Sequence, residues 1–477
     1  MDWHLIPSCE RTPCAGIEEI GDPHSRIAFC MLTIDRLPSV CLGALLVGGA
    51  LLAVCPTLAH PASPMEDRLG GSLTPWTVGA DTSDAPSFEP YATNRSLLYH
   101  VLATPAYILH GVTRPIGWGV RFVEQRYPGI FKPELRIRGI RPLVELGGPT
   151  GFLAGVALFD RQLLGGTDRG RLEILYGGPD TYEGKVLYAI PNAFGPQTNL
   201  EGVVNVFSDP RNEFYIGGNE SDIDTSEAFF SRWQVDATLG LRASSPNDVL
   251  SGGVDVLYEH VDATRGEGTE GDRIEALSPP GLGTVDLLTS RLLLGLNLTR
   301  GRPRTYWGTE MLLQLDYSHD LNAERFRYGR YVAEIRQYLP VGIFPKTRRL
   351  ALRARLEQVE PLFEGSAVPF YQLPDLGGRR MLRGFRAGRF QDAGSLLLTA
   401  EYRYPIWKNL DAVVLVDAGQ VFPELSAMSA DRFRWSYGGG IHLLSRKGIS
   451  FRFEVAGSTE GVRTILTVDP SFQRVVR

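Results

Sequence analysis

From about residue 137 to the end of the chain, apolar and polar residues alternate with a period of two, in segments of about ten residues. Gly, Pro, Asp and Asn, which favour turns, separate these segments. In segment 287–299, one face carries Leu288, Leu292, Leu294, Leu296 and Leu298, and the other carries Thr289, Arg291, Gly295 and Asn297. Segments 306–318 and 449–457 alternate in the same way. A period of two over this length predicts β-strands with one apolar and one polar face.

These strands predict an all-β fold, in which residues 137–477 form a transmembrane antiparallel β-barrel of about 16 strands. The strands of a soluble β-sandwich show the same alternation of apolar and polar residues. Two further features distinguish a membrane barrel from a sandwich here. Charged residues such as Arg353, Arg355 and Glu357 recur in mid-strand, which suits a water-filled lumen. Aromatic residues collect at strand ends, where the interface girdles of a barrel lie: Trp307, Tyr317, Tyr402, Tyr404 and Phe422. We therefore predict a barrel in the outer membrane of a Gram-negative bacterium, in contact with its lipids.

Residues 1–59 are predicted to form a leader and signal peptide, because the run 41–59 is apolar and ends in a small residue, Ala59. A start at Met31 would give a signal of more ordinary length. Two alternatives stay open: a lipoprotein modified at Cys55, and an uncleaved membrane anchor. Because no other apolar run approaches the length of a membrane helix, a helical membrane protein with several spans is excluded.

Residues 60–136 have a different composition, and we predict a periplasmic linker followed by a short helical segment. The linker, residues 60–90, is rich in Pro, Ser, Asp and Gly. In residues 94–127, Leu97, Leu98, Val101 and Leu102 recur at one-turn spacing, and two prolines interrupt the pattern. Such a stripe favours a plug or capping helix packed on a larger domain over a segment that recruits a partner.

Composition and charge exclude some classes of function. The 53 glycines and 32 prolines argue against a helical bundle. A net charge of -5 gives no electrostatic case for a nucleic-acid partner. All five cysteines precede the proposed cleavage point, so the mature chain would have no disulfide and no thiolate metal site.

Catalytic signatures are absent from the sequence. It contains no Gly-x-Ser-x-Gly elbow, no His-Glu-x-x-His helix and no phosphate-binding glycine loop. The eight histidines are scattered, and we expect His260, His319 and His442 to be loop or lumen residues. The sequence therefore predicts no enzyme, no metal and no cofactor.

The last hundred or so residues carry the most specific motifs. Residues 370–390 read FYQLPDLGGRRMLRGFRAGRF, which is too polar for a strand. The strands LLLTAEYRYPIW and DAVVLVDAGQVF follow, and then YGGGIHLL and ISFRFEVA. This order resembles the bacterial surface-antigen barrel of the BamA/TamA superfamily, which also includes FhaC-type secretion pores. The tip of the family's lumenal loop corresponds here to Leu382, Arg383, Gly384 and Phe385.

The resemblance implies that this tip folds back into the lumen, and that two inward carboxylates lie on the following strands. These carboxylates are Glu401 and Asp417, the latter in a motif where Leu415 replaces the usual aromatic residue. Alternation independently turns Glu401 and Asp417 away from the apolar face of their strands. Members of the family usually carry several periplasmic polypeptide-transport-associated domains. Residues 60–136 leave room for one at most, so the chain resembles the members that lack them.

Two inward carboxylates on neighbouring strands need cations. We predict that Arg383 bonds Asp417, Glu401 or both, and so anchors the loop inside the barrel. Alternation adds Arg403, Arg452 and Glu454 to the charges of the lumen. The alternative is a solvated extracellular loop whose five arginines bind lipid headgroups.

Three functions remain from this reading. The resemblance implies a barrel that assists the insertion or export of a protein or lipid client. A separate periplasmic partner, supplying the transport-associated domain that residues 60–136 lack, would favour this function. The second function is a passive channel or structural barrel without client machinery. The third, an outer-membrane enzyme, ranks last because no site supports it.

Overall fold

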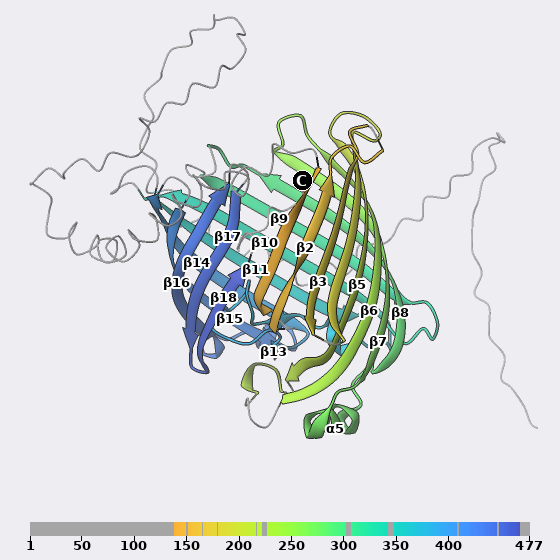
Figure 1. Ribbon diagram of the computed structural model, residues 1–477. Helices are drawn as coiled ribbons and strands as arrows, with labels where there is room; N and C mark the ends of the chain where they lie inside the picture. The colour runs from red at the N-terminus through yellow and green to blue at the C-terminus, as the bar shows by residue number, and fades with distance from the viewer. Residues whose placement is uncertain are drawn as a thin grey trace, which may run out of the picture. The chain divides into compact units, whose positions relative to one another are not determined.

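The computed structural model describes residues 138–467 except positions 149–150, 165, 179, 216, 222–226, 302–306, 342–347, 408–409 and 446–447. The leader, the signal peptide and the segment 60–136 all lie outside the described residues. Among the described residues, sixteen strands form one closed antiparallel barrel in which each strand pairs with its neighbours (Figure 1). The prediction of an antiparallel barrel of about 16 strands is confirmed.

The strands run in chain order around the barrel, and β18 returns to β1. The first half comprises β1 (Arg138–Gly148), β2 (Gly151–Asp160), β3 (Arg169–Gly178), β4 (Thr181–Pro191), β5 (Thr198–Tyr215), β6 (Glu227–Ser244), β7 (Leu250–Arg265) and β8 (Gly283–Asn297). The second half comprises β9 (Gly308–Asp320), β10 (Arg327–Pro340), β11 (Arg349–Pro361), β14 (Gly394–Trp407), β15 (Leu410–Phe422), β16 (Arg434–Ser445), β17 (Gly448–Ser458) and β18 (Gly461–Thr467). Helix α5 (Gly268–Leu277) and the two-residue strands β12 (Asp375–Leu376) and β13 (Phe390–Gln391) are not part of the barrel wall.

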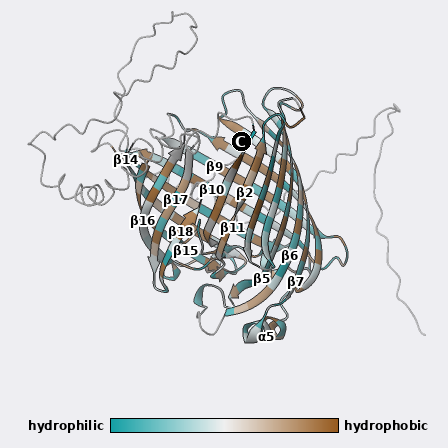
Figure 2. Cartoon of the chain, in the orientation of Figure 1, coloured by the Kyte–Doolittle hydropathy of each residue, from teal (hydrophilic) through white to brown (hydrophobic). Residues whose placement is uncertain are grey.

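The strands turn their apolar residues outward and their polar residues into the lumen. Figure 2 shows hydrophobic and hydrophilic residues intermixed along the strands. Leu294 on β8 is 47% exposed, whereas Thr289 on the same strand is 3% exposed and bonds Ser318 inside the barrel. Leu313 on β9 is the cross-strand partner of Leu294 and shares its outward face. The barrel therefore has the apolar outer wall and polar interior that a bilayer requires.

The two ends of the barrel differ in their connections. One end, here called the loop end, carries residues 216–226, 266–282, 362–393 and 423–433, and α5 and β13 mark it in Figure 1. The other end, the turn end, carries shorter connections such as 192–197 and 245–249. Outer-membrane barrels have short periplasmic turns and longer extracellular loops. This asymmetry assigns the loop end to the cell exterior.

An apolar cluster closes part of the lumen at the loop end. Phe370, in the connection between β11 and β14, packs edge-to-face on Phe214 and Phe230, with ring centroids 5.1 Å and 4.8 Å away. Ile274 of α5 is fully buried in the same cluster. Such aromatic pairs add to the energy of simple burial, so the cluster holds the connection across the barrel mouth.

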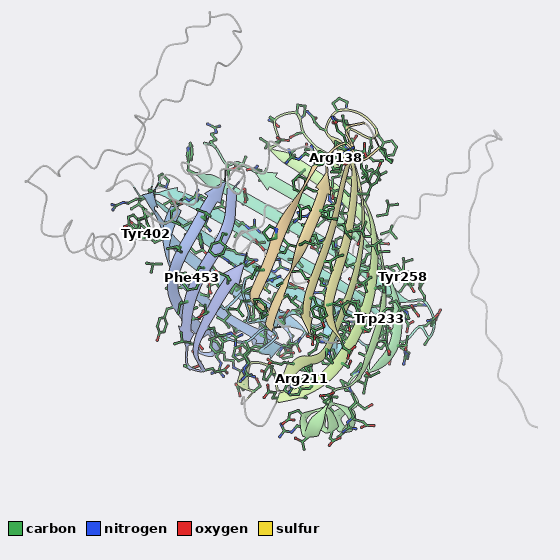
Figure 3. The ribbon with its side chains drawn as sticks, viewed as in Figure 1. Arg138, Arg211, Trp233, Tyr258, Tyr402 and Phe453 are labelled. Atoms are coloured by element: carbon green, nitrogen blue, oxygen red, sulfur yellow. The ribbon has the colours of Figure 1, made fainter. Side chains whose placement is uncertain are left out.

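Trp233, Tyr258 and Tyr317 are 39%, 37% and 41% exposed on the outer wall, and Figure 3 labels the first two. Two of the aromatic residues expected in the girdles are instead buried: Tyr404 is 4% exposed and Phe422 is 1% exposed. Phe422 points outward as expected, but residues of the connection 423–433 pack over it. This connection folds back on the outer wall, which alternation within strands cannot reveal.

The expectation for two histidines was wrong. His260 and His319 lie on the outward face, each two residues after an exposed tyrosine, and His260 bonds Asp286 at 2.7 Å. Only His442 lies in the lumen as expected. No helix in the described part of the chain is long and apolar enough to cross a membrane. The described residues contain no cluster of three side chains suited to a metal ion.

Candidate functional site in the lumen

The connection between β11 and β14 turns back into the barrel, and its tip is the Leu-Arg-Gly-Phe segment 382–385. The backbone turns at Leu382, whose φ is 49°, and the amide of Phe385 donates to the carbonyl of Leu382 at 3.0 Å. A side chain on Gly384 would lie 2.6 Å from the carbonyl oxygen of Gly457 on β17. Only glycine therefore allows the tip to approach the barrel wall this closely.

Arg383 binds Asp417 on β15 through three hydrogen bonds. Its Nε and Nη2 donate to the two carboxylate oxygens at 2.9 Å and 2.8 Å, and its backbone amide donates at 3.0 Å. Paired bonds between a planar guanidinium and a carboxylate fix orientation as well as distance. Both side chains are almost fully buried, at 2% and 0% exposed. The tip is thus fixed to one position on the wall.

The third nitrogen of the guanidinium serves two further carboxylates. Nη1 of Arg383 donates to Glu401 on β14 at 2.6 Å and lies 3.4 Å from both oxygens of Glu454 on β17. Arg403 donates to the other oxygen of Glu401 at 2.8 Å, and His442 bonds Glu454 at 2.7 Å. This set of Arg383, Arg403, Glu401, Asp417, Glu454 and His442 is called the lumenal latch below. Every carboxylate in it has at least two donors, as buried charges require.

Apolar packing supports the latch from the loop side. Leu376, Leu382, Phe385 and Phe390 of the loop form a buried cluster against Leu397 on β14 and Val421 on β15. A side chain at the inward position 419 would lie 2.8 Å from Leu376, so Gly419 leaves room for the loop. The tip is therefore held by an apolar contact and an ionic one together.

The opposite limb of the loop rests on a second charged wall, formed by β10 and β11. Glu334 accepts from Arg353 at 2.9 Å, and Arg353 also donates to the carbonyl of Arg380 in the loop at 3.3 Å. Arg330 donates to the side-chain oxygen of Gln372 at 3.0 Å. These strand arginines reach the loop through its backbone and amide groups, so they support it without requiring acidic residues in it.

Asp375 of β12 lies beside this wall, in the loop rather than in a spanning strand. Burial raises the pKa of its carboxyl to about 6, and nearby Glu357 adds to the effect, against the opposing charges of Arg330 and Arg355. Because the charged form is disfavoured there, the loop fits best when Asp375 is protonated.

Contacts at the loop end tie the loop to its neighbours. Arg389, which is 1% exposed, donates to the carbonyl of Ser221 at 2.7 Å and to Glu460 at 2.8 Å. Asn219, from the same connection as Ser221, donates to the carbonyl of Arg432 at 2.7 Å. Residues far apart in the chain therefore meet over the barrel mouth, where the connection that holds Asn219 and Ser221 joins the loop to the connection 423–433.

The site residues predicted from the sequence lie in one region of the lumen: Leu382, Arg383, Gly384, Phe385, Glu401, Arg403, Asp417, Arg452 and Glu454. Arg452 is fully buried but joins the latch only at 3.8 Å from Glu454. Sequence reasoning missed the contact of Glu454 with the tip and the role of His442. The alternation of apolar and polar residues predicts that the side chains of Glu454 and His442 point inward. It does not show that their strands, β17 and β16, lie beside the tip.

A closed strand barrel with an apolar outer wall, a charged lumen and a loop latched inside it defines an integral outer-membrane β-barrel. A family model described as the Omp85 superfamily domain matches residues 162–460. The chain belongs to the Omp85 superfamily, whose members are insertion and secretion barrels of the Gram-negative outer membrane. The protein is accordingly an outer-membrane protein of a Gram-negative bacterium.

Solved structures are similar in fold at low sequence identity. BamA from Haemophilus ducreyi lacking POTRA domains 1-3 gives a TM-score of 0.50 at 17% identity, over 69% of this chain and 69% of that chain. CdiB from Acinetobacter baumannii gives 0.46 at 13% identity, over 71% and 58% of the two chains. CdiB from Escherichia coli gives 0.44 at 10% identity, over 69% and 62%. No curated protein matches the sequence.

Proposed function

We propose that the protein assists the insertion or export of protein clients at the outer membrane, and that a client strand enters at the seam between β1 and β18. The proposal combines membership of the superfamily with one observation on the barrel. In the described residues, β1 and β18 share two residue pairs, Glu145 with Thr467 and Leu146 with Leu466. Every other interface of the barrel shares at least seven such pairs, as β2 with β3 and β17 with β18 do.

A strand edge is a suitable place for a protein client. Unpaired backbone N–H and C=O groups can add a further strand by the same hydrogen bonds that hold a sheet. Pro142 lies within β1 and has no N–H to give to a ladder, which is typical of an edge strand. An edge of this kind recognises a polypeptide rather than a lipid, so we favour a protein client over a lipid client.

The lumenal latch has a supporting role in this proposal. It holds the loop against β14 to β17, the strands that lead to the seam, and so gives that part of the wall a rigid backing. A passive channel is the other candidate. Cavities of about 480 Å³ at the turn end and about 460 Å³ beside the loop favour it. The aromatic cluster around Phe370 at the loop end speaks against a permanently open path.

The test compares the outer-membrane proteome and lipid composition of cells with and without the protein. An assembly or export role predicts that particular outer-membrane or secreted proteins fall in abundance, while lipid composition stays unchanged. Unchanged protein levels, together with ion conductance of the purified barrel in planar bilayers, would instead support the passive channel. Co-purification after chemical cross-linking would show whether a separate periplasmic partner takes part.

A further inference from the structure

Three buried polar side chains beside the seam leave bonding capacity unused. His442 on β16, Arg452 on β17 and Thr467 on β18 are 1%, 0% and 0% exposed. Nδ1 of His442, Nε and Nη1 of Arg452 and Oγ1 of Thr467 have no hydrogen-bond partner. Buried polar atoms of folded proteins nearly always have partners, so four such atoms in one place need an explanation.

These three residues form a single row across the sheet. His442 is the cross-strand partner of Arg452, and Arg452 is the cross-strand partner of Thr467. Thr467 in turn stands opposite Glu145 of β1, in one of the two described pairs of the seam. The row therefore leads from the lumenal latch to the place where a client strand would pair.

The charges around the row leave it able to accept an anion. Glu454, a carboxylate beside the row, is shared by His442 at 2.7 Å, Arg383 at 3.4 Å and Arg452 at 3.8 Å. Nη2 of Arg452 donates to the carbonyl of Arg379, a residue that adds a further positive charge nearby. The unused Nε and Nη1 of Arg452 point to opposite sides of the guanidinium, so one of them, together with the hydroxyl of Thr467, can donate to a carboxylate.

We infer that the row of His442, Arg452 and Thr467 binds a carboxylate carried by a strand that pairs with β18, and that it thereby selects the register of that strand. This inference depends on the proposed function, since it needs an incoming strand at the seam. The chain offers one internal parallel: the β1 residue at this register position, Glu145, is itself acidic. A strand shifted by one residue would turn its carboxylate to the other face and lose the contact.

Peptides with the sequence of β1 allow a direct test with the full chain in lipid nanodiscs. The full chain has five cysteines, all before residue 60, and these are first replaced by serine; Leu466→Cys then introduces a single thiol, opposite the register position of Leu146. Two peptides, RGIRPLVECGG and RGIRPLVQCGG, differ only in the residue that takes the place of Glu145. Disulfide formation between each peptide and the thiol introduced at position 466 is measured under one redox buffer.

We expect the glutamate peptide to cross-link at least about fivefold more than the glutamine peptide, which corresponds to about 1 kcal/mol. Arg452→Gln, combined with Leu466→Cys, should remove the difference. If that variant fails to fold, Thr467→Val serves instead, because it keeps the side-chain shape and deletes the hydroxyl. Arg291→Gln is the matched control: this arginine lies in the lumen on β8, bonds Asp316, and should leave the preference unchanged.

Equal cross-linking of the two peptides to the Leu466→Cys chain would overturn the inference and leave the proposed function intact, and it would mean that water fills the row. A preference that survives both Arg452→Gln and Thr467→Val would also overturn it. Cross-linking of neither peptide would contradict strand entry at the seam, and the inference would fall with the proposed function.

Discussion

At Arg383, one side chain connects the loop to three strands of the wall. Removing an arginine and three carboxylates from water is costly, and a buried ionic cluster seldom stabilises a protein more than good apolar packing would. The lumenal latch is therefore better understood as a device for position: its paired bonds to Asp417 are formed in one orientation of the tip only. Stability of the tip comes largely from the apolar cluster around Phe385.

Replacing Arg383 should release the tip. We expect Arg383→Ala to cost about 3–5 kcal/mol locally, because it leaves buried carboxylates without their main donor. Arg383→Lys should rescue little, since an ammonium group cannot make the paired contact. The measurement is protection of the loop from protease added to intact cells. Arg386→Lys is the control, because Arg386 is 42% exposed and its bond to Glu227 is worth about 1 kcal/mol or less. Full protection in Arg383→Ala would refute the anchoring role.

Asp375 gives the loop a dependence on pH. Its pKa in the folded protein, about 6, lies above the ordinary value of 3.8, so folding favours the protonated form. The resulting stability is complete below about pH 4 and is lost as the pH rises through 6. Asp375→Asn should therefore match the parent chain near pH 4 and exceed it at pH 7, by about 1–3 kcal/mol. Thermal unfolding of both chains across this range measures the difference. A constant difference between pH 4 and 7 would contradict the assigned pKa.

At the scale of the strand, alternation determines which residues meet lipid. Leu294→Arg should cost about 2–4 kcal/mol if the residue lies at the bilayer midplane. Gln314→Arg should be tolerated, because Gln314 lines a lumenal cavity and bonds Asp316, which can accept from the new guanidinium. Urea titration of unfolding and refolding in lipid vesicles gives the free energy of unfolding of each variant. Similar costs at the two positions would show that the faces are assigned wrongly.

Much of the barrel could be predicted because the strand period of two follows from backbone geometry. This period alone predicts that Leu294 faces outward and that Thr289 and Asp417 face the lumen. The position of the loop tip came from its motif. Connections obey no such period, so the burial of Phe422 beneath residues 423–433 could not be foreseen. The contact of Arg383 with Glu454 could not be foreseen either. Alternation within a strand does not show which strands surround a loop that folds back into the barrel.

The whole molecule combines a closed hydrogen-bonded wall with one interface that is short in the described residues. A closed barrel satisfies its backbone groups internally and resists detergent. We therefore expect the protein to fractionate with the outer membrane and to migrate faster in detergent gels before heating than after heating. Recovery as a soluble periplasmic protein that trypsin degrades completely would contradict the barrel.

A reversible disulfide across the seam tests whether clients enter between β1 and β18. Leu146→Cys with Leu466→Cys joins β1 to β18, and Leu294→Cys with Leu313→Cys joins β8 to β9 as the matched control. Both pairs are introduced into cells that lack the parent protein, and client levels in the outer membrane are quantified under oxidising and reducing conditions. We expect client levels to fall only with the oxidised seam pair and to recover on reduction. Normal client levels with a fully oxidised seam would contradict entry of clients at this interface.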